Sequence, residues 1–194
     1  MDRAALIADM ALEIEKKYRL TADEWVAVRA ALDQAGAENL GSHLEENVIY
    51  GGGVLDGFNG ILRVRRTDTM TTFTLKQRIE DHFDVKQQIE NETQVANGEA
   101  LDKILAGLGF RPRLIYEKNR ETWRFRRVEI VLDELPFGCY MEIEGSIAAI
   151  EEAESLLDID GLCLEHLTYP QLTTRFGSEI DNVIECRFAR NDQP

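Results

Sequence analysis

Residues 12–17 read Leu-Glu-Ile-Glu-Lys-Lys, an alternation of apolar and charged side chains near the amino terminus. Successive side chains of a β-strand point to opposite faces, so this period of two predicts a strand. Glu13, Glu15 and Lys17 would share one face of it, and the Leu and Ile side chains would share the other. The segment therefore predicts a half-buried strand whose polar face is fully charged.

The same alternation recurs along the chain, and in most segments one register is charged while the other is apolar. The charged positions come in pairs of one sign: Arg63 and Arg65, Lys76 and Arg78, Lys118 and Arg120, Glu90 and Glu92, Glu129 and Asp133, Glu142 and Glu144. Solvated protein surfaces usually intersperse the two signs. The segregation by strand therefore indicates that these side chains face a common charged space.

The periodicity predicts about eight strands and three or four helices. We expect strands near residues 12–18, 44–50, 60–66, 71–78, 86–95, 114–125, 128–134 and 139–144. We expect helices from the N-cap at Thr21 to Gly36, at 98–108, at 147–156 and at 169–176, with Pro170 in the first turn of the last one. Connections are expected at 67–69 and 79–84. Long antiparallel runs with a few helices favour an α+β fold.

Two architectures fit a sheet with one charged and one apolar face. One is an open sheet whose charged face is solvated, and the other is a closed barrel whose apolar outside is covered by the helices. A charged lumen is costly to desolvate unless its groups are paired or meet a ligand. A polyphosphate with a divalent metal would fit such a lumen, because Lys and Arg donate to phosphate oxygens and carboxylates bind Mg²⁺ or Mn²⁺.

Length and charge narrow the class of protein. The chain has 194 residues, which favours one domain over 1–194, with a core of about 11–176 and a tail of about 190–194 that we expect to be disordered. Its net charge of −14 disfavours nucleic-acid binding. There is no apolar run long enough for a membrane span, so we expect a cytoplasmic protein. The three cysteines lack the spacing of a zinc or redox motif.

An ordered set of short motifs resembles the CYTH superfamily, which includes class IV adenylate cyclases, thiamine triphosphatases and inorganic triphosphatases. The first motif is the ExExK of residues 13–17. It is followed by Leu62-Arg63-Val64-Arg65-Arg66, Thr74-Leu75-Lys76, Ile89-Glu90-Asn91-Glu92, Leu108-Gly109-Phe110, Tyr116-Glu117-Lys118-Asn119-Arg120, Leu132-Asp133-Glu134-Leu135 and Met141-Glu142-Ile143-Glu144-Gly145. Each motif is short, but their order over about residues 13–176 makes the resemblance specific.

The resemblance implies an eight-stranded antiparallel triphosphate tunnel with helices packed on its outside. It implies that the triphosphate is bound by Lys17, Arg63, Arg65, Lys76, Lys118 and Arg120. It implies Mg²⁺ or Mn²⁺ held by Glu13, Glu15, Asp133, Glu142 and Glu144, with Lys17, Glu15 and Asp133 taking part in catalysis. Glu90, Glu92 and Glu129 would be additional acids of the lumen, or would only neutralise neighbouring bases.

One feature departs from the family pattern. Family members commonly carry an aromatic residue and an aspartate after the tyrosine of the second strand, whereas Tyr50 is followed here by Gly51, Gly52 and Gly53. The glycines would form a flexible turn or a loop that binds phosphate. A Walker motif is excluded, because no Lys-Ser or Lys-Thr follows them.

The expected reaction is direct phosphoryl or nucleotidyl transfer, since no Ser, Cys or His constellation suggests a covalent intermediate. We expect a metal-dependent hydrolase of tripolyphosphate or of a nucleoside or thiamine triphosphate. The alternatives are a class IV adenylate cyclase, which makes cyclic AMP and pyrophosphate from ATP, and a noncatalytic module that binds triphosphate or polyphosphate. The partner would be a small molecule containing a triphosphate, bound by a monomer or homodimer.

Overall fold

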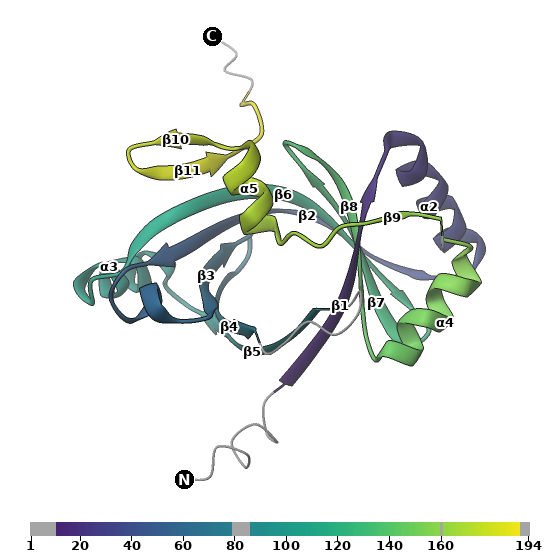
Figure 1. The fold of residues 1–194 in the computed structure, drawn as a ribbon, viewed down its shortest axis with the longest axis horizontal. Coiled ribbons are helices and arrows are strands. Elements are labelled where there is room, and N and C mark those ends of the chain that lie inside the picture. The colour runs from purple at the N-terminus through teal and green to yellow at the C-terminus, as the bar shows by residue number, and fades with distance from the viewer. Residues whose placement is uncertain (1–10, 79–85, 160, 191–194) are drawn as a thin grey trace.

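The computed structural model describes residues 11–78, 86–159 and 161–190, and the expected connection at 79–84 and the end of the expected tail, 191–194, lie outside them. Eight long strands carry the fold (Figure 1): β1 (Ala11–Leu20), β2 (Glu38–Gly51), β3 (Gly60–Arg66), β4 (Thr71–Arg78), β5 (Lys86–Val95), β6 (Arg111–Phe125), β7 (Val128–Leu135) and β8 (Gly138–Glu144). The helices are α2 (Ala22–Gln34), α3 (Gly98–Gly107), α4 (Ile147–Leu157) and α5 (Tyr169–Phe176), with a 3₁₀ turn η1 (Gly53–Gly57).

The eight strands close into a ring. They follow the order β6-β2-β3-β4-β5-β1-β8-β7, and β7 pairs again with β6. Every pair in the ring is antiparallel. The closed alternative and the α+β class are therefore confirmed, and the open sheet is excluded. Closure pairs each of the eight strands with a neighbour on both sides and gives each strand one face toward the lumen.

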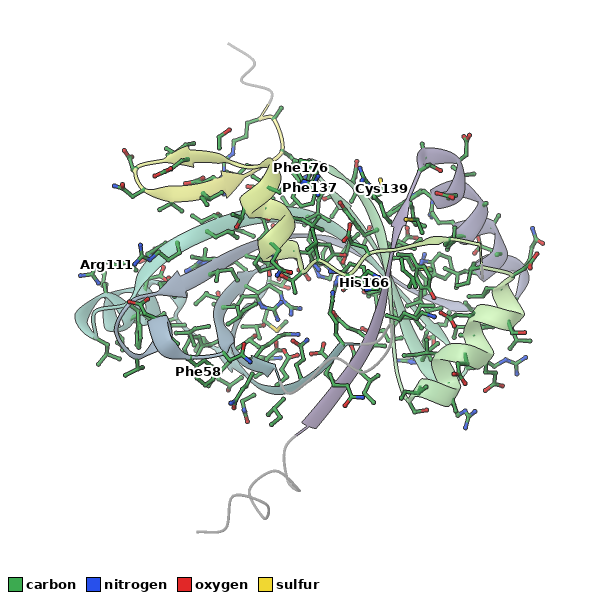
Figure 2. The ribbon with its side chains drawn as sticks, viewed as in Figure 1. Phe58, Arg111, Phe137, Cys139, His166 and Phe176 are labelled. Atoms are coloured by element: carbon green, nitrogen blue, oxygen red, sulfur yellow. The ribbon has the colours of Figure 1, made fainter. Side chains whose placement is uncertain are left out.

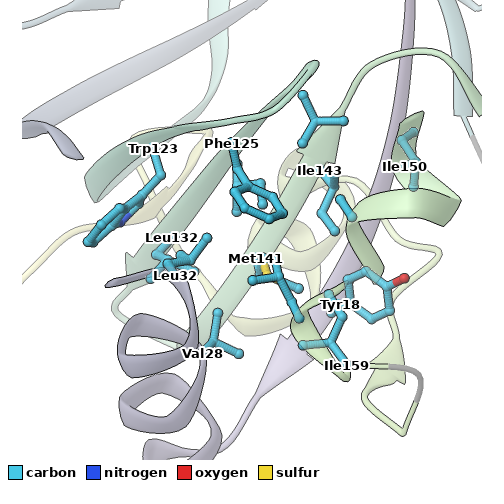
Figure 3. Packing of buried hydrophobic residues seen from close by; sticks show 14 of the residues in the cluster. Tyr18, Val28, Leu32, Trp123, Phe125, Leu132, Met141, Ile143, Ile150 and Ile159 are labelled. Atoms are coloured by element: carbon cyan, nitrogen blue, oxygen red, sulfur yellow. The ribbon is translucent and has the colours of Figure 1, made fainter. Parts of the chain in front are cut away.

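The apolar register of the strands faces outward and is covered by helices. Figure 3 shows the largest cluster, in which Val28 and Leu32 of α2 and Ile150 of α4 pack on Leu132 and Met141. The amino end of α2 is fixed by a capping box between Thr21 and Glu24, as its sequence predicts. On the other side of the ring, α3 covers β2 and β3, where Leu105 meets Val48 and Val64.

Helix α5 closes one end of the ring. On β6, Leu114 and Tyr116 lie in the same register as the lumen residue Lys118, yet they pack against Tyr169 and Leu172 of α5. A capping box between Thr168 and Gln171 starts the helix, and Pro170 lies in its first turn as expected. At its other end, Phe176 stacks on Phe137 of the β7–β8 turn with ring centroids 5.5 Å apart (Figure 2).

Three short strands were not predicted: β9 (Cys163–Leu164), β10 (Ser178–Ile180) and β11 (Val183–Cys186). Strands of two to four residues are too short to show a period. β10 and β11 form a hairpin, and β11 pairs in parallel with β6 at Leu114–Tyr116. The sheet thus continues past residue 176, and Figure 1 shows this hairpin in yellow beside α5.

β2 is also longer than the expected 44–50, because it pairs with β6 from Glu38 onward. Gly41 has φ +102, and the pairing shifts register beside it, which interrupts the alternation in the sequence. No helix among the described residues combines the length and the apolar character needed to cross a membrane.

Candidate functional site

The ring encloses a cavity of about 310 Å³. Its lining contains nearly every residue predicted for the site: Glu13, Glu15, Lys17, Arg63, Arg65, Lys76, Glu90, Glu92, Lys118, Arg120, Glu129, Glu142 and Glu144. These side chains come from seven of the eight strands, and each lies in the charged register of its strand. The shared cavity therefore follows from alternation along each strand together with closure of the ring.

The end of the cavity next to α5 is lined by buried cations. We call Lys17, Lys118 and Arg120 the deep cations. Lys17 and Lys118 are only 3% and 2% exposed. Lys17 Nζ lies 3.1 Å from Glu142 and donates to the Leu167 carbonyl oxygen at 3.3 Å. Burial opposes the charge of Lys17, but Glu142 and Glu15 outweigh it and raise its pKa, which favours the ammonium form.

Asp133 organises the deep cations and does not line the cavity. Its carboxylate is fully buried and accepts from Lys118 Nζ at 3.1 Å and from Arg120 Nε at 2.7 Å. The Tyr169 hydroxyl donates a further bond at 2.8 Å. A carboxylate with this many donors has little capacity left for an ion. In this structure Asp133 fixes Lys118 and Arg120, and the metal-ligand role expected for it stays a prediction.

Arg63 and Arg65 are the least engaged cations of the site. Arg63 reaches Glu90 and Glu92 only at 3.6 Å each, and Arg65 is 3.6 Å from Glu45. The Nε atoms of both arginines are buried and have no hydrogen-bond partner among the described residues. Buried guanidinium donors without acceptors are costly, so both side chains are suited to meet an anionic ligand.

A second ionic group lies on β1, β4 and β5. Lys76 Nζ is 2.8 Å from Glu13 and 2.7 Å from Glu90, and Gln88 donates to Glu13 at 2.7 Å. Burial raises the pKa of Glu13, and Lys76 only partly opposes it. Glu90 thus lines the cavity and is paired with Lys76 in this structure.

Three carboxylates form a row across adjacent strands. In the register of β1, β8 and β7, Glu144 lies directly opposite both Glu15 and Glu129, and we call these three residues the acidic row. Like charges at opposed positions destabilise a sheet. Desolvation of part of the Glu144 carboxylate, with the charges of Glu13 and Glu129 nearby, raises its pKa to about 7, although the residue as a whole remains exposed. Glu129 and Glu144 are exposed, so this side of the cavity reaches solvent.

The sequence matches the family described as CYTH domain over residues 11–166. The chain belongs to the CYTH family. None of the curated proteins matches its sequence.

Solved structures resemble this CYTH protein in fold. A protein of Pyrococcus horikoshii OT3 is 21% identical with a TM-score of 0.71, over 82% of this chain and 98% of that one. A Vibrio parahaemolyticus protein described as an adenylate cyclase candidate is 19% identical, TM-score 0.67, over 86% and 99%. A Hippeastrum adenylyl cyclase candidate, described as having a dominant triphosphatase activity, is 19% identical, TM-score 0.64, over 81% and 92%.

The residues of the CYTH site fit a divalent metal that is shared with a ligand. Within the part of the chain that the structure describes, no three His, Cys, Asp or Glu side chains are already grouped closely enough to enclose an ion. Magnesium, however, is usually held by one or two carboxylates together with substrate phosphates and waters. The acidic row and Glu13 provide hard oxygens of this kind, and an ion would relieve their mutual repulsion.

Two residues that contact the cations of the site, Glu45 and Tyr169, were not predicted from the sequence. Glu45 is fully buried on β2, 3.5 Å from Lys118 Nζ, and accepts from Asn47 at 3.3 Å. Burial opposes its ionisation, but Lys118 and Arg120 hold its pKa well below the usual range. The adjacent Glu46 faces outward and is also an acid. The alternation of apolar and charged side chains is therefore interrupted at this point, and the inward position of Glu45 could not be recognised. Tyr169 was missed because it comes from a helix rather than from a strand.

The three glycines after Tyr50 form a turn at the end of β2. Gly52 and Gly53 have φ of +99 and +58, which disfavours other residues. A Cβ on Gly52 would lie 3.0 Å from the carbonyl oxygen of Gly109. None of the three glycines lines the cavity, so the geometry agrees with the turn and not with a phosphate-binding loop.

We expect Glu144→Gln to raise the melting temperature at pH 8 in metal-free buffer. Because the folded pKa of Glu144 lies above its ordinary value of 4.5, the folded state binds the proton more tightly than the unfolded state. This contribution to stability is present below about pH 4.5 and is lost as the pH rises through about 7. The glutamine removes that loss. Melting curves of wild type and Glu144→Gln at pH 4.5 and pH 8 would check this prediction. The melting temperatures of the two proteins should converge at pH 4.5.

The matched control is Glu152→Gln on α4, an exposed glutamate whose partner Arg127 lies 2.6 Å away. This change removes a surface ion pair of small value, so no gain in stability is expected at pH 8. Equal melting temperatures of wild type and Glu144→Gln at pH 8 would contradict the repulsion assigned to the acidic row.

Proposed function

We propose that this CYTH protein is a divalent-metal-dependent hydrolase of a triphosphate substrate bound inside the ring. The observation that carries the proposal is the distribution of charge around one cavity. Arg63 and Arg65 offer unused donors, and the acidic row lies across from them on β1, β8 and β7. Neither set alone suits a triphosphate, but together they suit a triphosphate carrying a metal ion.

The cations would bind the phosphate chain. Arg63 and Arg65 can donate to phosphate oxygens in a forked geometry, and the deep cations extend this surface toward α5. Lys118 and Arg120 are already held in place by Asp133. Donors that are fixed before the substrate arrives stabilise developing charge without reorganising during the reaction.

The acids would hold the metal and position water. Glu13, Glu15 and Glu144 are the carboxylates that would bind Mg²⁺ or Mn²⁺, with Glu142 less available because it lies 2.8 Å from Arg120 and 3.1 Å from Lys17. The metal, when bound, supplies positive charge that neutralises phosphate oxygens. Glu15 would orient the attacking water, and Lys17 would donate to an oxygen of the phosphoryl group that is transferred.

Hydrolysis requires fewer contacts between the site and the substrate than cyclisation does. A class IV adenylate cyclase must bind adenine and fold the ribose over the inner phosphorus, in addition to holding the triphosphate. The Hippeastrum structure, whose fold this chain shares, is described as having a dominant triphosphatase activity. A noncatalytic binding module is expected to have lost a metal ligand or a basic residue of the site, yet Glu13, Glu15 and Arg63 all line the cavity. These observations favour the hydrolase.

The test is a product assay on tripolyphosphate, ATP and thiamine triphosphate with Mg²⁺ or Mn²⁺. We expect release of orthophosphate from at least one of them. Cyclic AMP and pyrophosphate from ATP would instead identify a cyclase. Binding of tripolyphosphate with no product from any substrate would identify the noncatalytic module and contradict the proposal.

A further inference from the structure

We infer that Tyr169 is a positioning residue of the triphosphate site, contributed by a segment that lies beyond the matched CYTH residues 11–166. The inference rests on the proposed function. Thr168, Tyr169 and Pro170 all line the cavity. The start of α5 is therefore part of the wall of the site.

Tyr169 contacts an acid, Asp133, and two of the deep cations, Lys17 and Lys118. Its hydroxyl donates to Asp133 at 2.8 Å. Its ring centroid is 3.7 Å from Lys17 Nζ and 5.0 Å from Lys118 Nζ, distances at which a ring attracts a cation. Tyr169 is 6% exposed, so both interactions are shielded from water. One side chain thus contacts two lysines, Lys17 and Lys118, and the carboxylate of Asp133.

The segment around Tyr169 is anchored on both sides. Before it, Glu165 N donates to the Lys17 carbonyl at 2.9 Å, and the Leu167 carbonyl accepts from Lys17 Nζ. After it, β11 pairs with β6, and the backbone N of Phe188 donates to Glu117 at 3.0 Å. The phenol ring therefore has a fixed position relative to Lys17, as positioning of a catalytic group requires.

The two parts of the side chain have separable effects. Without the hydroxyl, Asp133 still binds Lys118 and Arg120 but can turn away from the geometry that fixes them. Without the ring, Lys17 loses its cation–π contact and is held only by Glu142 and the Leu167 carbonyl, so its ammonium is positioned less precisely for phosphate. We therefore expect the hydroxyl to affect turnover and the ring to affect substrate binding as well.

The experiment compares Tyr169→Phe and Tyr169→Leu with wild type on the best triphosphate. Loss of one hydrogen bond should lower kcat by about three- to tenfold in Tyr169→Phe, with KM nearly unchanged. Tyr169→Leu should also raise KM, and kcat/KM should fall by at least about thirtyfold, since the cation–π contact is lost too. A purely structural role would lower the melting temperature but leave the kcat and KM of the folded enzyme unchanged.

Tyr140→Phe is the matched control. Tyr140 is fully buried, its ring packs edge-on against Tyr169 at 5.6 Å, and its hydroxyl has no hydrogen-bond partner among the described residues. Removing this hydroxyl should leave kcat and KM within about twofold of wild type, because no bond is lost.

A binding measurement separates the inference from the proposed function. Tripolyphosphate should raise the melting temperature of wild type and Tyr140→Phe, and the rise should be smaller in Tyr169→Leu. If wild type binds tripolyphosphate but hydrolyses none of the three triphosphates, the proposed function fails, while a reduced rise in Tyr169→Leu still supports the role of Tyr169. Equal rises, or wild-type kcat and KM in both Tyr169 variants, overturn the inference.

Discussion

Arg63→Ala is expected to lower kcat/KM for the triphosphate substrate at least about tenfold, because one charge-assisted hydrogen bond is worth roughly 1.5 to 3 kcal/mol. The guanidinium lines the cavity, its Nε is without a partner among the described residues, and its two ion pairs are long at 3.6 Å. Little native bonding is therefore lost in the variant. KM should rise if Arg63 acts mainly in binding, and steady-state kinetics would show it.

Arg66→Ala is the control on the same strand. Arg66 lies in the outward register of β3 and binds Asp102 of α3 at 2.6 Å, a shorter contact than any that Arg63 makes. Its loss should lower the melting temperature modestly without changing kcat/KM. Near wild-type kinetics in Arg63→Ala, with the fold intact by circular dichroism, would mean that the basic residues of the cavity do not bind substrate.

Removal of divalent metal is expected to lower kcat at least about a hundredfold, since a bound ion contributes several kcal/mol of charge stabilisation. Without it, the acidic row would face the phosphate chain directly. The fold should survive, because Lys76 neutralises Glu13 and Arg120 neutralises Glu142. Activity and melting curves in excess chelator, followed by addition of Mg²⁺ or Mn²⁺, would measure both effects.

Glu15→Ala refines the same test. If Glu15 holds the metal, Glu15→Ala should lower kcat more than it raises KM, and a higher metal concentration should partly restore kcat.

Full turnover of wild type in excess chelator would contradict the metal roles proposed for Glu13, Glu15 and Glu144. Unfolding in chelator would instead indicate a structural metal.

The charged register of the site could be predicted from the sequence, because it depends only on the local geometry of a strand. Alternation assigned Glu13, Arg63 and Glu142 to one face, and the structure brings all three to one cavity. The ordered motifs then indicated the family, which the match over residues 11–166 confirmed. Residue roles in binding and catalysis remain proposals, since they depend on a substrate.

What the sequence by itself determined is which side chains share a face of each strand, the signs they carry and the helices that follow the strands. Only the tertiary structure decided how those charges are used. Strand order and register place Asp133 beside Lys118, leave Arg63 with unused donors, and bring Tyr169 from a distant helix against Lys17. The physical reason is that the period of a strand is set by neighbouring residues, whereas pairing across a closed ring depends on segments far apart in the chain.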